Sequence, residues 1–237
     1  MVGMTIRIFS TSFTPPPTPT IVVTGQSASG RIRIAITNPA PGVGEPALLE
    51  NYLYRRESGD TTWTRIETGI GASETTYDYA VASGVTYEYK VRAVGDNDVT
   101  ADSNTGSDLV TLTELWIHAV ANPATTILSV PYQHDPSPNE SWDAQSTVLQ
   151  PEGRTRPVVE FGDQESFRFQ ATIRFGASAQ ADWIALRDLI RTKATLCVRD
   201  IEGRRIFGVI PRLGKFEARW GHETAIEIVE IDYDEEV

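Results

Sequence analysis

The sequence contains few of the residues that carry covalent cross-links, metal ions or catalysis. Its 237 residues include one cysteine and three histidines, so no internal disulfide can form and folding in a reducing compartment is expected. His118, His134 and His222 are too far apart to match a short metal-ligand motif, and no Cys-x-x-Cys, Gly-x-Ser-x-Gly or phosphate-binding glycine loop is present. Cys197 has no histidine tied to it by spacing. We therefore expect no enzyme activity, no catalytic residue, no metal and no cofactor.

The chain also lacks long apolar runs and a surplus of basic residues. The longest stretch free of Asp, Glu, Lys and Arg covers residues 115–134 and contains two prolines, so we expect no membrane-spanning segment. Residues 1–8 show no basic region followed by an apolar run, so secretion is not expected. The net charge of −11 is opposite to what the neutralisation of phosphates requires, so nucleic acid is not an expected partner.

What is present fits two folded, β-rich domains. Hydrophobic residues make up 40% and charged residues 22% of the chain, which is ordinary globular usage, and the length favours two domains. The segment TPPPTPT, residues 14–20, cannot supply ladder N–H groups and is interpreted as a lead-in to the first domain. We predict an all-β fold with an N-terminal arm or linker (1–16), a β-sandwich-like domain (17–113) and a second β-sandwich-like domain with one short α-helix (114–237).

Short β-branched and aromatic runs, separated by Gly, Pro, Asn and Asp turns, indicate the first sandwich. Every second residue from Ile32 to Ile36 is isoleucine, and Tyr87, Tyr89 and Val91 alternate with charged residues. This period of two places one face of each strand in a core. The predicted strands are residues 21–24, 31–37, 49–56, 63–67, 75–79, 86–94 and 107–112.

Three stretches of this region resemble fibronectin type III domains. They are SGVTYEYKVRAVG (83–95), TNPAPG after the second strand, and YLYRRESGDTTWTRI across the third and fourth strands. The resemblance covers about residues 17–113. It implies that Tyr87 is a tyrosine-corner residue, whose ring packs in the core while its hydroxyl satisfies an upstream backbone group. It also implies that Ile36 stands where the family usually has a tryptophan, so that the core is repacked around a smaller side chain.

The second domain contains one strand with a clear alternation, because every second residue from Phe167 to Phe175 is apolar. An apolar stripe at helical spacing predicts a helix over residues 179–191. In the turn Asp200–Arg204, Gly203 is expected to supply a positive φ between two strands. The remaining pattern predicts a sandwich or barrel with further strands at 115–120, 126–130, 158–161, 195–199, 205–211, 215–219 and 224–233.

The blocks RPVVEFGD (156–163), FRFQATIRF (167–175), the helix and VRDIEGRRIFGVI (198–210) resemble, in pattern and order, the C-terminal region of minor tail proteins of tailed phages that infect actinobacteria. The resemblance covers about residues 114–237. It implies a structural protein of the virion that is synthesised in the host cytoplasm and incorporated at the tail tip or baseplate. Other phage tail proteins would be its partners, and it would act in tail assembly and host-surface attachment.

The distribution of charge in the second domain and the N-terminal segment each have two interpretations. Nine basic side chains lie from Arg187 to Arg219, whereas seven acidic residues and no basic residue lie from Glu223 to Val237. These patches either pair head to tail between copies and close a homo-oligomeric ring, or are screened within one chain. Likewise, residues 5–13 are either an arm that adds a strand to a neighbour's sheet edge or a frayed terminus.

A carbohydrate-binding module that contacts cell-wall or surface glycans is the second hypothesis. Fibronectin-like domains often accompany sugar-binding sandwiches, and exposed aromatic rings stack on sugar rings. The candidate contacts are Trp116, Tyr132, Trp142 and Trp220, although part of this set is expected in the core. An enzyme domain is a third hypothesis, which the missing motifs disfavour.

Overall fold

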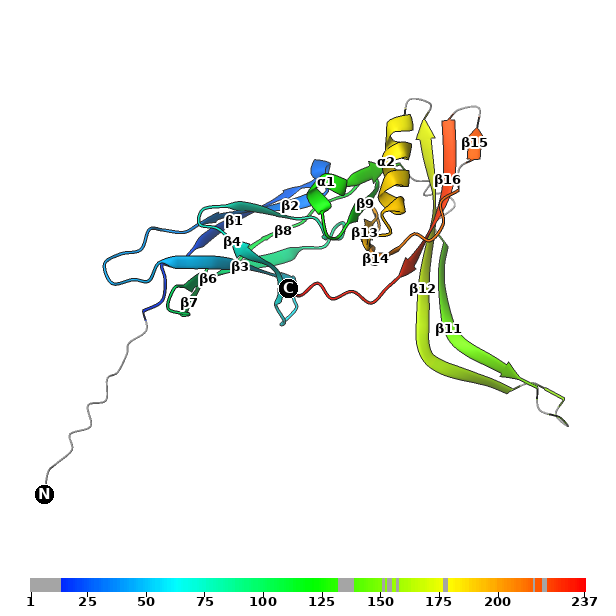
Figure 1. Cartoon of the computed structure of the whole chain (residues 1–237), viewed down its shortest axis with the longest axis horizontal. Helices are drawn as coiled ribbons and strands as arrows, with labels where there is room; N and C mark the ends of the chain where they lie inside the picture. The colour runs from blue at the N-terminus through cyan, green and yellow to red at the C-terminus, as the bar shows by residue number, and fades with distance from the viewer. Residues whose placement is uncertain are drawn as a thin grey trace, which may run out of the picture.

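The computed structural model describes residues 14–131, 139–150, 152, 155–156, 158–176, 179–214, 216–218 and 221–237. These residues form three antiparallel sheets and one helix longer than a single turn, which confirms the all-β class. The first domain lies lengthwise and the sheet of the second domain stands across its end (Figure 1). The candidate arm at residues 5–13 lies outside the described residues.

The first domain is a sandwich of two antiparallel sheets. One sheet has the order β1-β2-β5, and the other has the order β4-β3-β6-β7 with β8 also paired to β6. The alternating isoleucines of β2 face the alternating Tyr87, Tyr89 and Val91 of β6 in one core, as the period of two predicts. The strands are β1 Thr20–Gln26, β2 Arg31–Thr37, β3 Leu48–Glu57, β4 Thr64–Ile70, β5 Thr75–Asp78, β6 Tyr87–Gly95, β7 Thr100–Asp102 and β8 Gly106–Asp108.

A tyrosine corner is present at the start of β6. The Tyr87 side chain is fully buried, and its hydroxyl oxygen accepts a hydrogen bond of 3.1 Å from the backbone N–H of Ala82, five residues upstream. Ile36 is 3% exposed and belongs to the same core. Together with the strand order, these contacts make the first domain a fibronectin type III-like β-sandwich.

The second domain is one sheet rather than two stacked sheets. Its order is β10-β9-β13-β14-β16-β12-β11, with β15 also paired to β16. The backbone N–H of Arg174 in β12 donates to the carbonyl oxygen of Pro131, just after β10, at 3.2 Å, so the sheet curls toward a barrel. The strands are β9 Leu115–Ala119, β10 Leu128–Val130, β11 Asn139–Leu149, β12 Val158–Gly176, β13 Leu196–Arg199, β14 Arg205–Val209, β15 Phe216–Ala218 and β16 Gly221–Glu230.

Helix α2, Gln180–Arg191, occupies the place that a second sheet would take. Its buried residues Trp183, Leu186 and Leu189 pack into the same core as the alternating apolar residues of β12. The Trp183 ring meets Phe175 edge-on at a centroid distance of 6.1 Å. One amphipathic helix is therefore enough to cover the apolar face of the curled sheet. Within the described residues, no helix is long and apolar enough to cross a bilayer.

Two local predictions have clear outcomes. Gly203 has φ 88° in the turn between β13 and β14, where Asp200 N–H donates to the Arg204 carbonyl, so the predicted hairpin is confirmed. The segment 126–130, predicted to be a strand throughout, instead begins at the end of the single-turn helix α1, Pro123–Thr126, and only Leu128–Val130 forms β10. Proline at the first helical position favours this turn of helix.

Candidate functional site

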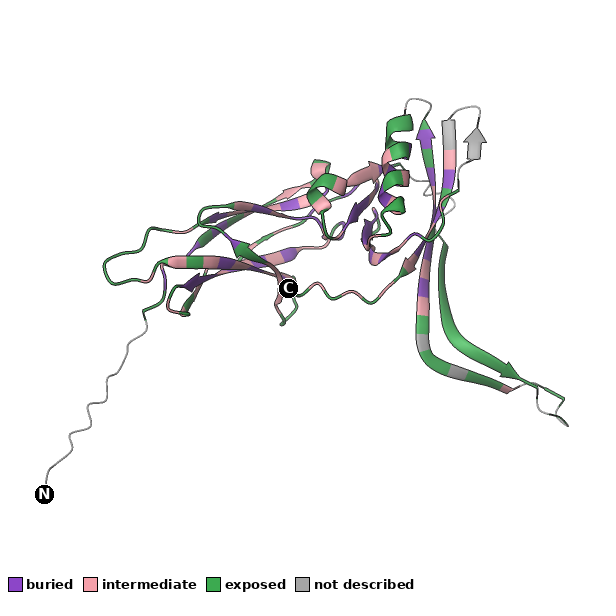
Figure 2. Cartoon of the chain, viewed as in Figure 1, coloured by how far each residue is buried: buried purple, intermediate pink, exposed green. Residues whose placement is uncertain are grey.

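A projecting hairpin is the most unusual surface of the molecule. β12 pairs with β16 only from Arg168 to Gly176, so its outer part is paired with β11 alone. All eleven residues of β11 are exposed, and no described side chain from 158 to 166 is buried (Figure 2). We call residues 139–149 and 158–166 the hairpin arm. A two-stranded ribbon without a buried face is only marginally stable by itself.

The hairpin arm exposes apolar side chains. Trp142 is 67% exposed, and its ring lies 4.5 Å from that of Phe167 where the arm meets the sheet. Val148 pairs with Val159 farther out, and both are exposed. β11 is also the last strand of its sheet, so one backbone edge is open. An open edge with exposed apolar side chains is a template for another chain.

A second surface feature is a cleft of about 720 Å³ between α2, β13 and the segment that follows β14. Its apolar lining includes Ile190, Val209 and Leu213, while Arg187 and Arg191 stand on the helix side. Lys193 adds a third cation, and none of the described residues that line the cleft is acidic. We call this cleft the α2 groove.

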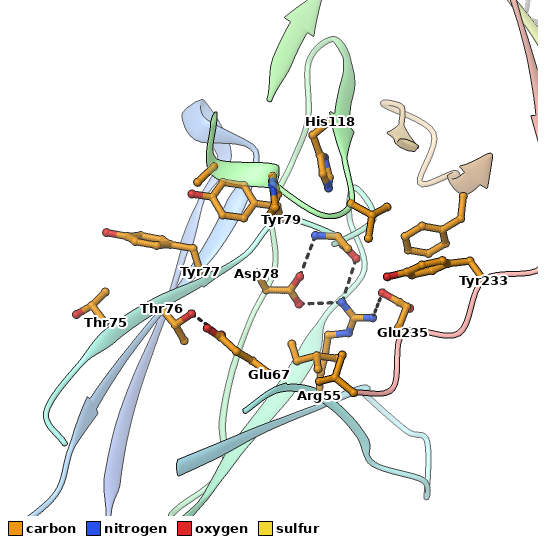
Figure 3. A pocket seen from close by; sticks show the side chains of 17 residues that line it. Arg55, Glu67, Thr75, Thr76, Tyr77, Asp78, Tyr79, His118, Tyr233 and Glu235 are labelled. Atoms are coloured by element: carbon orange, nitrogen blue, oxygen red, sulfur yellow. Dashed lines mark hydrogen bonds and ion pairs between the residues drawn. The ribbon is translucent and has the colours of Figure 1, made fainter. Parts of the chain in front are cut away.

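A third feature is a pocket of about 420 Å³ between the two domains (Figure 3). At its floor the Arg55 guanidinium pairs with Asp78 at 2.9 Å and with Glu235 at 2.7 Å. Burial disfavours the charged Asp78 carboxylate, but the Arg55 charge and the hydrogen bonds from Arg55, the Ala80 N–H and Tyr89 together outweigh burial and hold the pKa of Asp78 below its ordinary value. The Tyr89 hydroxyl donates to Asp78 at 2.9 Å, and burial, followed by the Asp78 charge, raises the pKa of Tyr89. This pocket floor is a satisfied polar network.

His118 of β9 lines the same pocket (Figure 3). Its side chain is buried, and its Nδ1 has no hydrogen-bond partner among the described residues. Burial, and then the nearby Arg199, lower the pKa of His118 to about 3. The imidazole is therefore neutral at pH 7.

Arg199 joins the domains from the middle of the second sheet. Its side chain is fully buried, and its Nη1 donates to the carbonyl oxygens of Gly30 at 2.7 Å and Val81 at 3.1 Å, both in the first domain. Arg205 of the neighbouring strand donates to the Ala80 carbonyl at 2.9 Å. Neither contact has a signal in the sequence, because each joins positions more than 100 residues apart, 169 for Gly30 and 125 for Ala80.

The C-terminal residues also return to the first domain. The backbone N–H of Val237 donates to the Arg65 carbonyl at 3.0 Å, and Glu235 bridges Arg55 and Arg205. The acidic C-terminal patch is thus partly neutralised within its own chain. Arg191, Lys193 and Arg212 of the basic region have no ion pair among the described residues.

The four candidate glycan contacts lie in different places. Trp116 is half-buried at the domain junction, where it packs against the core of the first domain beside Gly30. Trp142 lies on the hairpin arm. Tyr132 and Trp220 lie outside the described residues. The structure therefore shows one exposed aromatic ring of the proposed set, Trp142.

The described residues contain no group of three or more His, Cys, Asp or Glu side chains able to hold a metal ion. Cys197 lies in β13, as the strand prediction placed it, and is fully buried. Burial raises the pKa of its thiol to about 12, so the thiol is protonated at neutral pH.

No family model matches the chain, and no curated protein matches it. Among solved structures, an Fn3-like protein from Clostridium thermocellum is 25% identical, with 43% of this chain and 97% of that chain covered and a TM-score of 0.33. A pectate lyase from Erwinia chrysanthemi in complex with tetragalacturonic acid is 20% identical over 38% of this chain and 28% of that chain, with a TM-score of 0.33. The twitchin kinase region from C. elegans is 13% identical over 92% of this chain and 39% of that chain, with a TM-score of 0.31. The fibronectin type III-like fold of the first domain is defined by its own strand order and tyrosine corner.

Proposed function

We propose that this protein is a non-catalytic structural component of a phage tail tip or baseplate, which acts by assembling with other copies of itself and with other tail proteins. The observation that carries the proposal is the hairpin arm. Its eleven-residue strand β11 buries no side chain within its own chain. A ribbon that its own domain does not support is best explained by a partner surface that supports it.

The arrangement of the domains supports the same role. The hairpin arm and the α2 groove both belong to the second domain, whereas the first domain extends away from it (Figure 1). A ring formed through the second domain leaves the first domain directed outward, where it is able to contact a host surface. Arg199 and Arg205 fix the two domains to each other, so the outward direction is held by the structure of each copy.

Labelling of the chain in purified particles tests the location. An antibody against the first domain should decorate the tail tip or baseplate of the virion in negative-stain images. Particles from a host that expresses an unrelated tagged protein serve as the control. If the chain is absent from purified virions, the structural proposal is wrong.

A second candidate function is contact with a glycan through Trp142, which is 67% exposed. An exposed indole offers an apolar face for stacking on a sugar ring. A glycan array or a cell-wall pulldown with the full chain and with Trp142→Ala separates this function from pure assembly. Binding that disappears in the variant favours glycan contact, and equal binding by both chains removes Trp142 from that role.

A further inference from the structure

We propose that the hairpin arm of one copy docks into the α2 groove of the next copy. The inference rests on the proposed assembly function and names the surfaces that carry it. It makes the contact between copies heterologous, with each chain supplying one arm and one groove. Such a contact closes into a ring when the rotation between neighbours permits.

Charge complementarity supports this pairing. Residues 139–166, which hold the arm and its connecting turn, contain six acidic residues and two arginines. Glu160, Asp163 and Glu165 are exposed and form no ion pair among the described residues. Among the described residues, the α2 groove is lined by Arg187, Arg191 and Lys193 and by no acid; Arg187 pairs with the neighbouring Asp188 at 2.8 Å, so Arg191 and Lys193 supply its unpaired positive charge. Opposite potentials therefore face each other when arm and groove come together.

Exposed apolar side chains on the arm also match the apolar lining of the groove. Val148 and Val159 form an exposed cross-strand pair on the arm, 58% and 44% exposed. The groove offers an apolar lining that includes Ile190, Val209 and Leu213. An interface with an apolar centre and a charged rim is the usual anatomy of a specific protein contact.

The dimensions allow one chain to reach the next. At roughly 3.3 Å per residue, the nine residues of β12 from 158 to 166 have a contour length of about 30 Å, although the strand bends at the register shift between Phe161 and Glu165. The arm points away from the body of its own domain (Figure 1). A reach of this size exceeds the radius of a domain of about 100 residues, which is roughly 13 Å by radius of gyration.

The alternative contact, in which two β11 edges pair with each other, gains no charge complementarity. β11 contains Glu140 and Asp143 and no basic residue, and both carboxylates already pair within their own chain, with Arg204 and Arg168. A second β11 edge therefore offers no cation to the exposed Glu160, Asp163 and Glu165, whereas the groove does.

The test uses charge reversal in the full chain. The groove variant is Arg187→Glu with Arg191→Glu, and the arm variant is Glu160→Lys with Asp163→Lys. Each variant alone should associate at least about tenfold more weakly than the wild type, because arm and groove then carry the same sign. An equimolar mixture of the two variants should recover association, because every arm then meets a groove of opposite charge. Sedimentation velocity over a concentration series measures the association, and circular dichroism checks that each variant is folded.

A matched control reverses two exposed acids of the first domain, Asp60→Lys with Asp96→Lys, and so changes the net charge as much as the arm variant does. It should associate like the wild type. An apolar variant, Val148→Ser with Val159→Ser, should weaken association without changing the net charge.

Two outcomes overturn the inference. If the groove variant associates as tightly as the wild type, the α2 groove does not accept the arm, although assembly through another surface stands. If the wild type remains a monomer at every concentration, the contact between copies does not exist. The labelling of virions then decides the proposed function separately.

Discussion

The two halves of β12 belong to one continuous strand and have opposite surroundings. From residue 167 to 175 the strand pairs with β16, and its alternate residues are buried against α2. From 158 to 166 it pairs with β11 alone, and no described side chain is buried. The inner half is stabilised by burial within one chain, whereas the outer half has only its cross-strand hydrogen bonds and pairs. A strand can therefore be continuous in geometry while only part of it contributes to the stability of the folded monomer.

The largest loss of stability is expected from a truncation in the inner half of β12. Phe169→Ala removes a side chain that is 1% exposed from the core of the second domain. We expect the free energy of unfolding to fall by about 3–5 kcal/mol, because transfer and cavity costs add. Urea unfolding followed by tryptophan fluorescence measures the change. A loss below about 1 kcal/mol would show that this half of β12 is not part of the core.

Buried and exposed carboxylates should differ in their contribution to stability in the same way as the two halves of β12. Asp78→Asn removes one of the two carboxylates that pair with the buried Arg55 guanidinium and leaves Glu235 at 2.7 Å, so it should cost about 1.5–3 kcal/mol. Asp143→Asn on the arm removes an exposed partner, 3.5 Å from Arg168, and should cost about 0–1 kcal/mol. Urea unfolding at pH 7 measures both values.

Acid should narrow the difference in stability between Asp78→Asn and the wild type. The Asp78 pKa is lowered in the folded chain, so its contribution is present above the ordinary value of 3.8 and is lost as pH falls through the folded pKa. Below pH 3.8 the wild type should therefore approach Asp78→Asn in stability. A gap that stays constant down to acid unfolding would contradict the pairing.

The buried His118 should make the stability of the folded chain depend on pH at milder values. Its pKa falls from 6.5 to about 3 on folding, so the unfolded chain binds a proton that the folded chain rejects between these values. Stability should decrease as pH is lowered through this window, by up to about 1.4 kcal/mol per pH unit. His118→Gln should flatten the slope between pH 6.5 and 4. Thermal melts of both chains across that range give the slopes, and parallel slopes would remove His118 as the cause.

The smallest effect is expected on the outer half of β12. Val159→Ser changes a side chain that is 44% exposed, so the stability of the isolated chain should stay within about 0.5 kcal/mol of the wild type. The urea midpoint of the dilute chain is the measurement. A loss as large as that of Phe169→Ala would mean that the arm is packed within its own chain.

The sequence predicts those parts of the fold in which burial alternates. Ile32 to Ile36, Tyr87 to Val91 and Phe167 to Phe175 are strands because one face of each is in a core. β11 has no such signal, because all of its residues are exposed and a strand without a buried face has no hydrophobic period. For the same reason the sequence predicts β12 as two separate strands.

The sites are less predictable than the strands. Tyr87 is recognisable because its partner, the Ala82 N–H, lies five residues away in a known motif. Arg55 and Glu235 are 180 residues apart, and Arg199 bonds backbone carbonyls that any residue type provides. The α2 groove combines a helix with the segment after β14, so its outline depends on how the sheet curls. A local sequence pattern cannot predict contacts between residues that are far apart in the chain.

The attachment of Arg199 and Arg205 to the first domain has a mechanical consequence. A force applied to the first domain reaches the second domain along three routes: the peptide link before β9, the two guanidinium groups on β13 and β14, and the C-terminal residues that bind Arg55 and Arg65. Since β13 and β14 are interior strands of the sheet, the load enters where each strand is held by neighbours on both sides. The joint therefore resists bending as well as extension, and a force on the first domain is distributed across the sheet instead of being concentrated on one stretch of chain.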